Sequence, residues 1–317
     1  MQTRKDFLGT LLGAAVSVDA VAANSAAPLV RTDGRKPLKV VEKGLGGGKV
    51  ICLSNRSRER MSSTVFVSPS GRVAVVDGGF YEDGENLRTV LEGLGGKVDF
   101  WFLTHAHCDH FGALVSLIER GAVLSGLEIR KLRYSFPSDD WLEKAEPRRF
   151  GHVRRFNAAV ERIRGRVPVE AQTRDSVYDL GGDWRFTVLN DFSIGLKSPN
   201  VNDTSVCLSL DANGRKWLVL GDIGLRVCGT LADELGPRLE HEFVFMAHHG
   251  QNGGDKRFYA AVKAKTAIWP TTDWLWENDG GQGPGSGPFK TNYTKCWMQE
   301  LGVKEHHVLA NQDVVFV

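Results

Sequence analysis

The first half of the chain alternates between short apolar runs and segments in which apolar residues recur at helical spacing. The runs at 64–67 and 73–76 flank Pro69-Ser70-Gly71, which is typical of a β-hairpin. The strands expected in this half are 49–53, 64–67, 73–76, 98–103 and 127–134. The expected helices are 85–94, 111–120 and a long basic segment at 139–166. This half therefore begins with strands and continues with helices and strands in turn.

The second half repeats this order without an exact internal repeat. Its expected strands are 184–189, 205–210, 216–220, 242–246, 266–269 and 308–317, and its expected helices are 225–235, 256–262 and 292–301. Asn213-Gly214 joins two of these strands and is a strong hairpin signal. Two β-rich halves, each followed by helices, predict an α/β fold in which two mixed β-sheets pack together with helices outside.

The N-terminus has the pattern of an export signal. Arg4 and Lys5 precede a weakly apolar stretch at 9–21, and small residues at 22–27 offer a cleavage site. The segment resembles a twin-arginine signal with lysine in the second place. We therefore expect an export signal at 1–27, a linker at 28–48 and one domain at 49–317, in a periplasmic bacterial protein. The alternatives are a frayed tail and, without a working signal, a cytoplasmic protein.

Composition narrows the class of protein. The 317 residues are 42% hydrophobic and 25% charged with a net charge of +2, which excludes a disordered, collagen-like or coiled-coil chain. The near-neutral balance gives no overall preference for nucleic acid or membrane. Five scattered cysteines without a CxxC pair cannot form a complete disulfide framework. Any special chemistry must therefore be local.

One short segment concentrates metal-binding side chains. His105, His107, Asp109 and His110 fall within six residues, directly after a buried strand. Imidazole nitrogens and a carboxylate oxygen together suit zinc or another borderline divalent cation. The segment therefore predicts a metal site.

These four residues match the HxHxDH motif, and from about residue 49 to 317 the sequence resembles the metallo-β-lactamase superfamily. The resemblance implies a four-layer αββα sandwich and a hydrolase. It also implies that Asp77 orients a ligand histidine, that Asp222 bridges two metals and that His249 is the last ligand.

The sequence departs from many members of this superfamily in one respect. Between His110 and Asp222 the only histidine is His152, and the segment 202–206 stands where a further histidine ligand is common. In this the chain resembles the branch that includes the hydrolase domain of competence-type DNA-uptake proteins and the phosphorylcholine esterases of teichoic acid. That branch implies a first metal with two histidines and the bridging aspartate.

The implied ligand set leads to a mechanism. His105, His107 and Asp222 would hold one divalent cation, and Asp109, His110, Asp222 and His249 the other, with zinc expected first and manganese second. The cations would lower the pKa of a shared water to about 7, and the metal-bound hydroxide would attack the substrate. Asp109 and His248 are the candidate catalytic residues. His248 would hold a phosphate oxygen or protonate the leaving group, and the alternative is a surface or supporting histidine.

The expected function is hydrolysis of a phosphodiester, small or polymeric. The alternatives are hydrolysis of a carboxylic ester, lactone, lactam or thioester, and a non-catalytic metal-stabilised binding protein. Trp269, Trp274 and Trp276 either stack on substrate or pack the domain. The arginines between Pro147 and Pro168 either contact phosphates, nucleic acid included, or form a solvated helix face. The sequence does not determine the oligomeric state.

Overall fold

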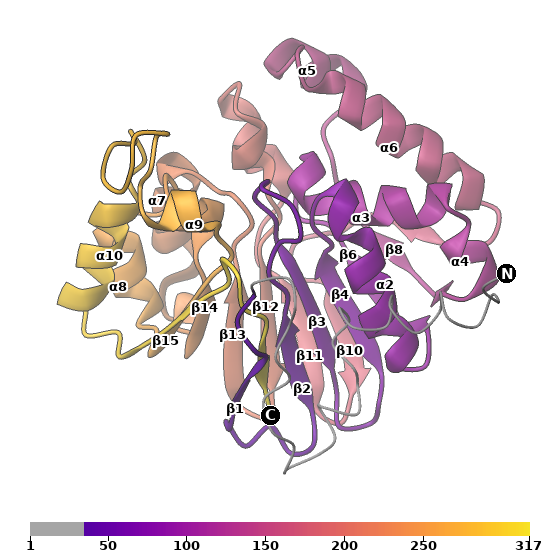
Figure 1. The fold of residues 1–317 in the computed structure, drawn as a ribbon, viewed down its shortest axis with the longest axis horizontal. Helices are drawn as coiled ribbons and strands as arrows, with labels where there is room; N and C mark the ends of the chain where they lie inside the picture. Colours follow the sequence, from indigo (N-terminus) through magenta and orange to yellow (C-terminus); the bar gives the residue numbers. More distant parts are fainter. Residues whose placement is uncertain (1–34) are drawn as a thin grey trace, which may run out of the picture.

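A computed structural model describes residues 35–317 of the chain. Two β-sheets face each other at the centre, and helices cover both outer faces (Figure 1). The expected export signal at 1–27 and the first part of the expected linker lie outside the described residues, so the expectation of export stays a prediction.

The first sheet has eight strands in the order β1-β17-β2-β3-β4-β6-β8-β9. The bounds are β1 Lys39–Val41, β17 Val314–Phe316, β2 Lys49–Cys52, β3 Ser63–Val67, β4 Val73–Asp77, β6 Phe100–Phe102, β8 Leu132–Arg133 and β9 Val169–Glu170. Strands β3 and β4 form the expected antiparallel hairpin, and β4, β6, β8 and β9 run parallel. The sheet is therefore mixed. A separate parallel pair joins β5 (Lys97–Val98) and β7 (Glu128–Ile129).

The second sheet has seven strands in chain order, β10 to β16. The bounds are β10 Val177–Gly181, β11 Trp184–Val188, β12 Leu208–Ala212, β13 Arg215–Val219, β14 Phe243–Phe245, β15 Thr266–Trp269 and β16 Glu305–Val308. The first four are antiparallel neighbours, and β13 to β16 are parallel. Parallel strands bring their carboxyl ends to one edge of the sheet, where ligand sites are common.

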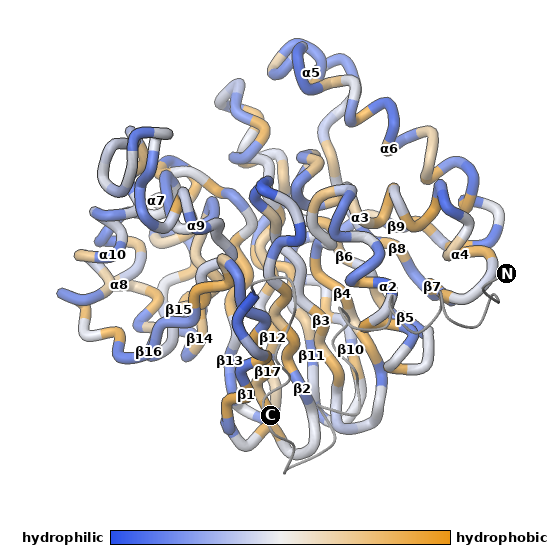
Figure 2. Tube along the Cα trace, viewed as in Figure 1, coloured by the Kyte–Doolittle hydropathy of each residue, from blue (hydrophilic) through white to orange (hydrophobic). Residues whose placement is uncertain are grey.

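Three apolar clusters separate the layers. Between the sheets, Phe66 of β3 packs edge-on against Phe186 of β11 with ring centroids 5.2 Å apart. The helices over the first sheet are α2 Gly84–Gly93, α3 Cys108–Glu119, α4 Ala122–Ser125, α5 Asp139–Ala145 and α6 Phe150–Ile163. Those beside the second are α7 Leu225–Leu235, α8 Lys256–Val262, α9 Asp273–Trp276 and α10 Thr291–Glu300. Figure 2 shows hydrophobic residues along the strands and hydrophilic ones along the outer turns of α5 and α6. The architecture is the expected four-layer αββα sandwich.

Several expected boundaries differ from those in the structure. The expected strand at 308–317 is two strands in different sheets, β16 and β17, because the chain turns between them. The expected helix at 139–166 is broken into α5 and α6 near Pro147, which cannot donate a backbone hydrogen bond. Residues 39–41, expected in the linker, form the edge strand β1 against β17. The apolar run in this segment, Val40-Val41, is too short to indicate a strand.

Candidate metal centre

The expected ligands come from four separate segments at one end of the sandwich. His105 and His107 follow β6, while Asp109 and His110 lie in the first turn of α3. Asp222 follows β13, and His249 lies in the short turn η5 (Ala247–Gly250) after β14. Strands β6, β13 and β14 therefore deliver these groups to a common point.

The side chains form two donor clusters that share one carboxylate. Asp109, His110, Asp222 and His249 form one cluster and His105, His107 and Asp222 the other, and all of them are buried. In the first cluster Nε2 of His110 lies 3.3 Å from Oδ1 of Asp222, and Nε2 of His249 lies 3.3 Å from its Oδ2. In the second, Nε2 of His105 is 3.0 Å from Nδ1 of His107 and 3.9 Å from Oδ2 of Asp222. The structure thus brings all six expected ligands together.

A buried carboxylate at the end of β4 orients two of the histidines. Asp77 accepts hydrogen bonds from the backbone and hydroxyl of Thr104, at 2.8 and 3.0 Å, and from Nδ1 of His110 at 2.7 Å. The Thr104 hydroxyl lies 3.1 Å from Nδ1 of His105 and can accept its proton. Both rings are held with Nε2 toward the cluster, which is how such partners fix a ligand tautomer.

The other two ligand histidines have partners of their own. Nδ1 of His249 donates to the carbonyl of Pro270 at 2.7 Å, which leaves Nε2 as the donor atom for a cation. Nε2 of His107 lies 3.1 Å from Oε2 of Glu146, which leaves Nδ1 of His107 for the second cluster. The Glu146 carboxyl is partly buried, which would raise its pKa, but its bond to His107 prevails and the pKa is lowered. Glu146 is therefore ionised and can accept a hydrogen bond from Nε2 of His107.

The donor set fits divalent cations. Nε2 of His110 and Nε2 of His249 are buried, and within residues 35–317 neither has a hydrogen-bond partner. Such orphaned atoms are costly unless a ligand satisfies them. Burial and the neighbouring His110 keep the pKa of His105 well below its ordinary value, so its imidazole is neutral, the form that binds metal.

The backbone at His248 and His249 is strained. Both residues have left-handed conformations, with φ of 50° and 57°, which non-glycine residues seldom adopt. Gly250 follows with φ of 83°, and a Cβ there would clash with the Trp269 ring. This tight turn directs His249 to the cluster and His248 to the pocket wall.

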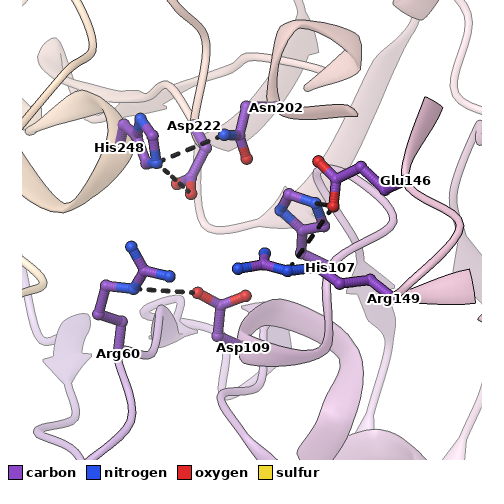
Figure 3. A pocket seen from close by; sticks show the side chains of 8 residues that line it. All are labelled: Arg60, His107, Asp109, Glu146, Arg149, Asn202, Asp222 and His248. Atoms are coloured by element: carbon purple, nitrogen blue, oxygen red, sulfur yellow. Dashed lines mark hydrogen bonds and ion pairs between the residues drawn. The ribbon is translucent and has the colours of Figure 1, made fainter. Parts of the chain in front are cut away.

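A pocket of about 330 Å³ opens above the clusters (Figure 3). Every residue that lines it is polar: Arg60, His107, Asp109, Glu146, Arg149, Asn202, Asp222 and His248. Nε2 of His248 lies 3.9 Å from Oδ2 of Asp222 and 3.4 Å from Nδ2 of Asn202. Burial lowers the pKa of His248 to about 4, so its ring is neutral near pH 7.

Cys108 and the three tryptophans do not belong to the two clusters. Burial raises the pKa of Cys108 to about 12, so it stays a thiol, and it belongs to neither cluster. Trp269 is buried in the core and packs edge-on against Trp276, while Nε1 of Trp274 donates to the carbonyl of Arg58. These tryptophans pack the domain and are absent from the lining of the described pocket.

The arginine-rich segment is mostly a paired helix face. Arg154, Arg155 and Arg164 form ion pairs with Glu143, Glu119 and Glu161. Of the described arginines in this segment, only Arg149 lines the pocket.

Sequence reasoning missed Glu146, Arg60 and the positioning role of Thr104. Thr104 directly precedes the motif, so its place was a usable signal. Glu146 and Arg60 lie in charged stretches where no local pattern distinguishes them from surface residues.

The chain is similar to known proteins in sequence and in structure. The sequence model of the metallo-beta-lactamase superfamily matches residues 57–270. No curated protein sequence matches the chain. Among solved structures, the metallo-beta-lactamase fold protein YhfI from Bacillus subtilis is 13% identical, with 83% of this chain and 97% of that chain covered and a TM-score of 0.48.

Two further structures are similar to a comparable degree. Zn(2+)-bound PqqB from Methylobacterium extorquens is 11% identical, with coverage of 84% and 99% and a TM-score of 0.48. Unliganded yeast PDE1 is 8% identical, with coverage of 85% and 97% and a TM-score of 0.49. Among the described residues, none of the helices combines the length and apolar character of a membrane span. With the family match extending over most of the sandwich and across the HxHxDH segment, the chain belongs to the metallo-beta-lactamase superfamily.

Proposed function

We propose that this protein is a dinuclear metal-dependent phosphodiesterase. The observation that carries the proposal is the sharing of Asp222 by two donor clusters at the base of a wholly polar pocket. When bound, two divalent cations supply Lewis acidity and lower the pKa of water toward about 7. The mixed imidazole and carboxylate set suits zinc first and manganese second.

The chain's own residues have distinct roles in this proposal. His105 and His107 would hold one cation, Asp109, His110 and His249 would hold the other, and Asp222 belongs to both donor sets. His248 faces the pocket, and its neutral ring would hold a phosphate oxygen by a hydrogen bond. Asn202 lies 3.4 Å from the His248 ring and positions it.

The polar wall favours phosphorus chemistry over acyl transfer from an apolar substrate. Among the described residues, the pocket lining contains no aliphatic residue and no phenylalanine, tyrosine or tryptophan that could contact an acyl group. The resemblance of the segment around Asn202 to the phosphodiester-cleaving branch supports the same choice.

The test is turnover of a chromogenic panel by metal-loaded protein. We expect phosphodiesters to be cleaved faster than phosphomonoesters, carboxylic esters, lactones and β-lactams. Chelation should abolish turnover, and added zinc, manganese or cobalt should restore it. Faster cleavage of carboxylic esters or lactones would replace the proposed function with the carbonyl alternative. Bound metal without any turnover would favour the non-catalytic binding protein.

A further inference from the structure

Two arginines far apart in the sequence enter the pocket from opposite sides (Figure 3). Arg60 comes from the loop between β2 and β3, and Arg149 from the corner between α5 and α6. Both guanidinium groups point toward the space above Asp109 (Figure 3). We call this pair the arginine clamp.

The N–H groups of both guanidinium groups are available as hydrogen-bond donors for a ligand. Nε of Arg60 is 3.9 Å from Oδ2 of Asp109, and Nε of Arg149 is 3.7 Å from Oε2 of Glu146, both beyond hydrogen-bond distance. Neither guanidinium donates a hydrogen bond to any residue in the described part of the chain. In contrast, Arg155 donates two to Glu119, at 2.9 and 2.7 Å. The clamp can therefore offer planar pairs of donors to an anion.

Hydrogen bonds hold the backbone near both arginines of the clamp. In the Arg60 loop, the Ser62 backbone donates to the carbonyl of Asp109 at 3.1 Å, and Trp274 Nε1 donates to the carbonyl of Arg58 at 3.1 Å. The Arg149 backbone donates to the carbonyl of Glu146 at 3.0 Å, at the start of α6. Donors held on fixed backbone lose less entropy when they bind a ligand.

With two divalent cations bound, the positive charge of the pocket would exceed the single negative charge of a phosphodiester. Two divalent cations would contribute four positive charges and the clamp two, while Asp109, Glu146 and Asp222 contribute three negative ones. The pocket would then keep three positive charges, or two when the attacking hydroxide is counted, and a phosphodiester brings only one negative charge. Without the clamp, the remaining positive charge would not exceed the charge of the phosphodiester.

From these observations we infer that the substrate carries a second anionic group, a phosphate or a carboxylate, which Arg60 and Arg149 bind beside the scissile phosphodiester. This inference rests on the proposed function. The volume of about 330 Å³ lies near the lower end of the range of about 300–1,000 Å³ for small-molecule sites. The pocket can therefore hold the scissile phosphodiester together with one further anionic group.

The kinetic test compares three para-nitrophenyl phosphodiesters on metal-loaded protein. One has a plain ethyl arm, and the other two carry a terminal phosphate or a terminal carboxylate on that arm. Arg60→Gln and Arg149→Gln should each lower kcat/KM for a charged diester by about 10- to 100-fold, mainly through KM, and by a clearly smaller factor for the plain one. The charged diester that is preferred by the unmodified protein identifies the second group. Arg154→Gln, an exposed position on α6 paired with Glu143, is the matched control and should change none of these values.

A binding measurement keeps this inference separate from the proposed function. By calorimetry on metal-loaded protein, methylenediphosphonate should bind more tightly than methylphosphonate, and both clamp variants should remove that difference. Clamp-dependent binding without any phosphodiester cleavage would overturn the proposed function but support the clamp. Phosphodiester cleavage with equal losses on plain and charged diesters would overturn the clamp and leave the proposed function standing.

Discussion

At the scale of single residues, the site depends on Asp222. Its two oxygens lie on different sides, one near His110 and the other near His249 and His105. Its backbone donates to the Ser205 hydroxyl at 3.0 Å, and Gly221 before it has φ of 55°, where a Cβ would meet Ser205 at 2.9 Å. A glycine at this turn therefore lets Asp222 reach both clusters.

Asp222→Ala should remove both cations, because each cluster loses a ligand. His105→Ala should mainly weaken the cluster that has three donors. Elemental analysis after gel filtration measures the two contents. Full, equal metal retention in Asp222→Ala would contradict the shared carboxylate.

Substitution of His248 should distinguish phosphodiester hydrolysis from hydrolysis of a carbonyl substrate. His248→Ala should keep its metals and lose about 10²- to 10³-fold in rate on alkyl phosphodiesters, because the phosphate loses a hydrogen bond in the transition state. The loss on activated nitrophenyl esters should be much smaller. The measurement is the ratio of the two losses on protein of confirmed metal content. Loss of one metal would instead make His248 a ligand.

At the scale of elements, the corner between α5 and α6 couples the pocket wall to a ligand. Glu146 contacts His107, and Arg149 lies three residues further on. Leu142, Phe150 and Val153 pack beneath the corner against Ala106, which lies between His105 and His107. The apolar contacts therefore fix the corner against the HxH segment itself.

Glu146→Gln should weaken metal binding at the cluster with His107 by about 10-fold, and Glu146→Ala by up to about 100-fold, because the ring loses a charged partner. Competition with a chromophoric chelator gives the two affinities. The four-donor cluster should be unchanged. Glu143→Gln, on an exposed turn of α5, serves as the control, and a similar weakening there would count against a specific role for Glu146.

Sequence patterns predicted some of the elements correctly and not others. Helix α7 matches its predicted bounds, because its apolar spacing and its neighbours are local. The six candidate ligands came from one motif and from the family resemblance, and the structure brings them together. The division of 308–317 could not be predicted, because it depends on pairing with distant strands and on Asp313, which accepts from the Ser54 backbone at 2.8 Å. Glu146 and Arg60 were missed for the same reason, since only the folded chain brings them to the site.

At the scale of the whole molecule, stability should depend on pH through His307. This residue of β16 is buried and packs edge-on against Phe316 of the other sheet, with ring centroids 4.9 Å apart. Burial and the charge of Lys39 lower the pKa of His307 to about 4, below the ordinary value of 6.5. The folded protein therefore favours the neutral ring. The resulting stabilisation is present above pH 6.5 and is lost as the pH falls toward 4.

The free energy of unfolding of the unmodified protein should therefore decline relative to that of His307→Gln by about 1 to 2 kcal/mol between pH 7.5 and pH 5. Urea titrations of both proteins at the two pH values, with saturating metal, measure this difference. Parallel decline of both proteins would contradict the role given to His307.

The position of β17 has a consequence for how the protein forms during synthesis. This strand lies between β1 and β2, so these two early strands are not neighbours and need residues 314–316 to join them. A ribosome makes the whole second sheet from β10 to β16 before it makes β17. The edge of β2 must therefore stay unpaired for most of translation, and an unpaired edge is a site for wrong association. Completion of the first sheet is thus a late event, and a nascent chain that stops before residue 314 should expose this edge to chaperones.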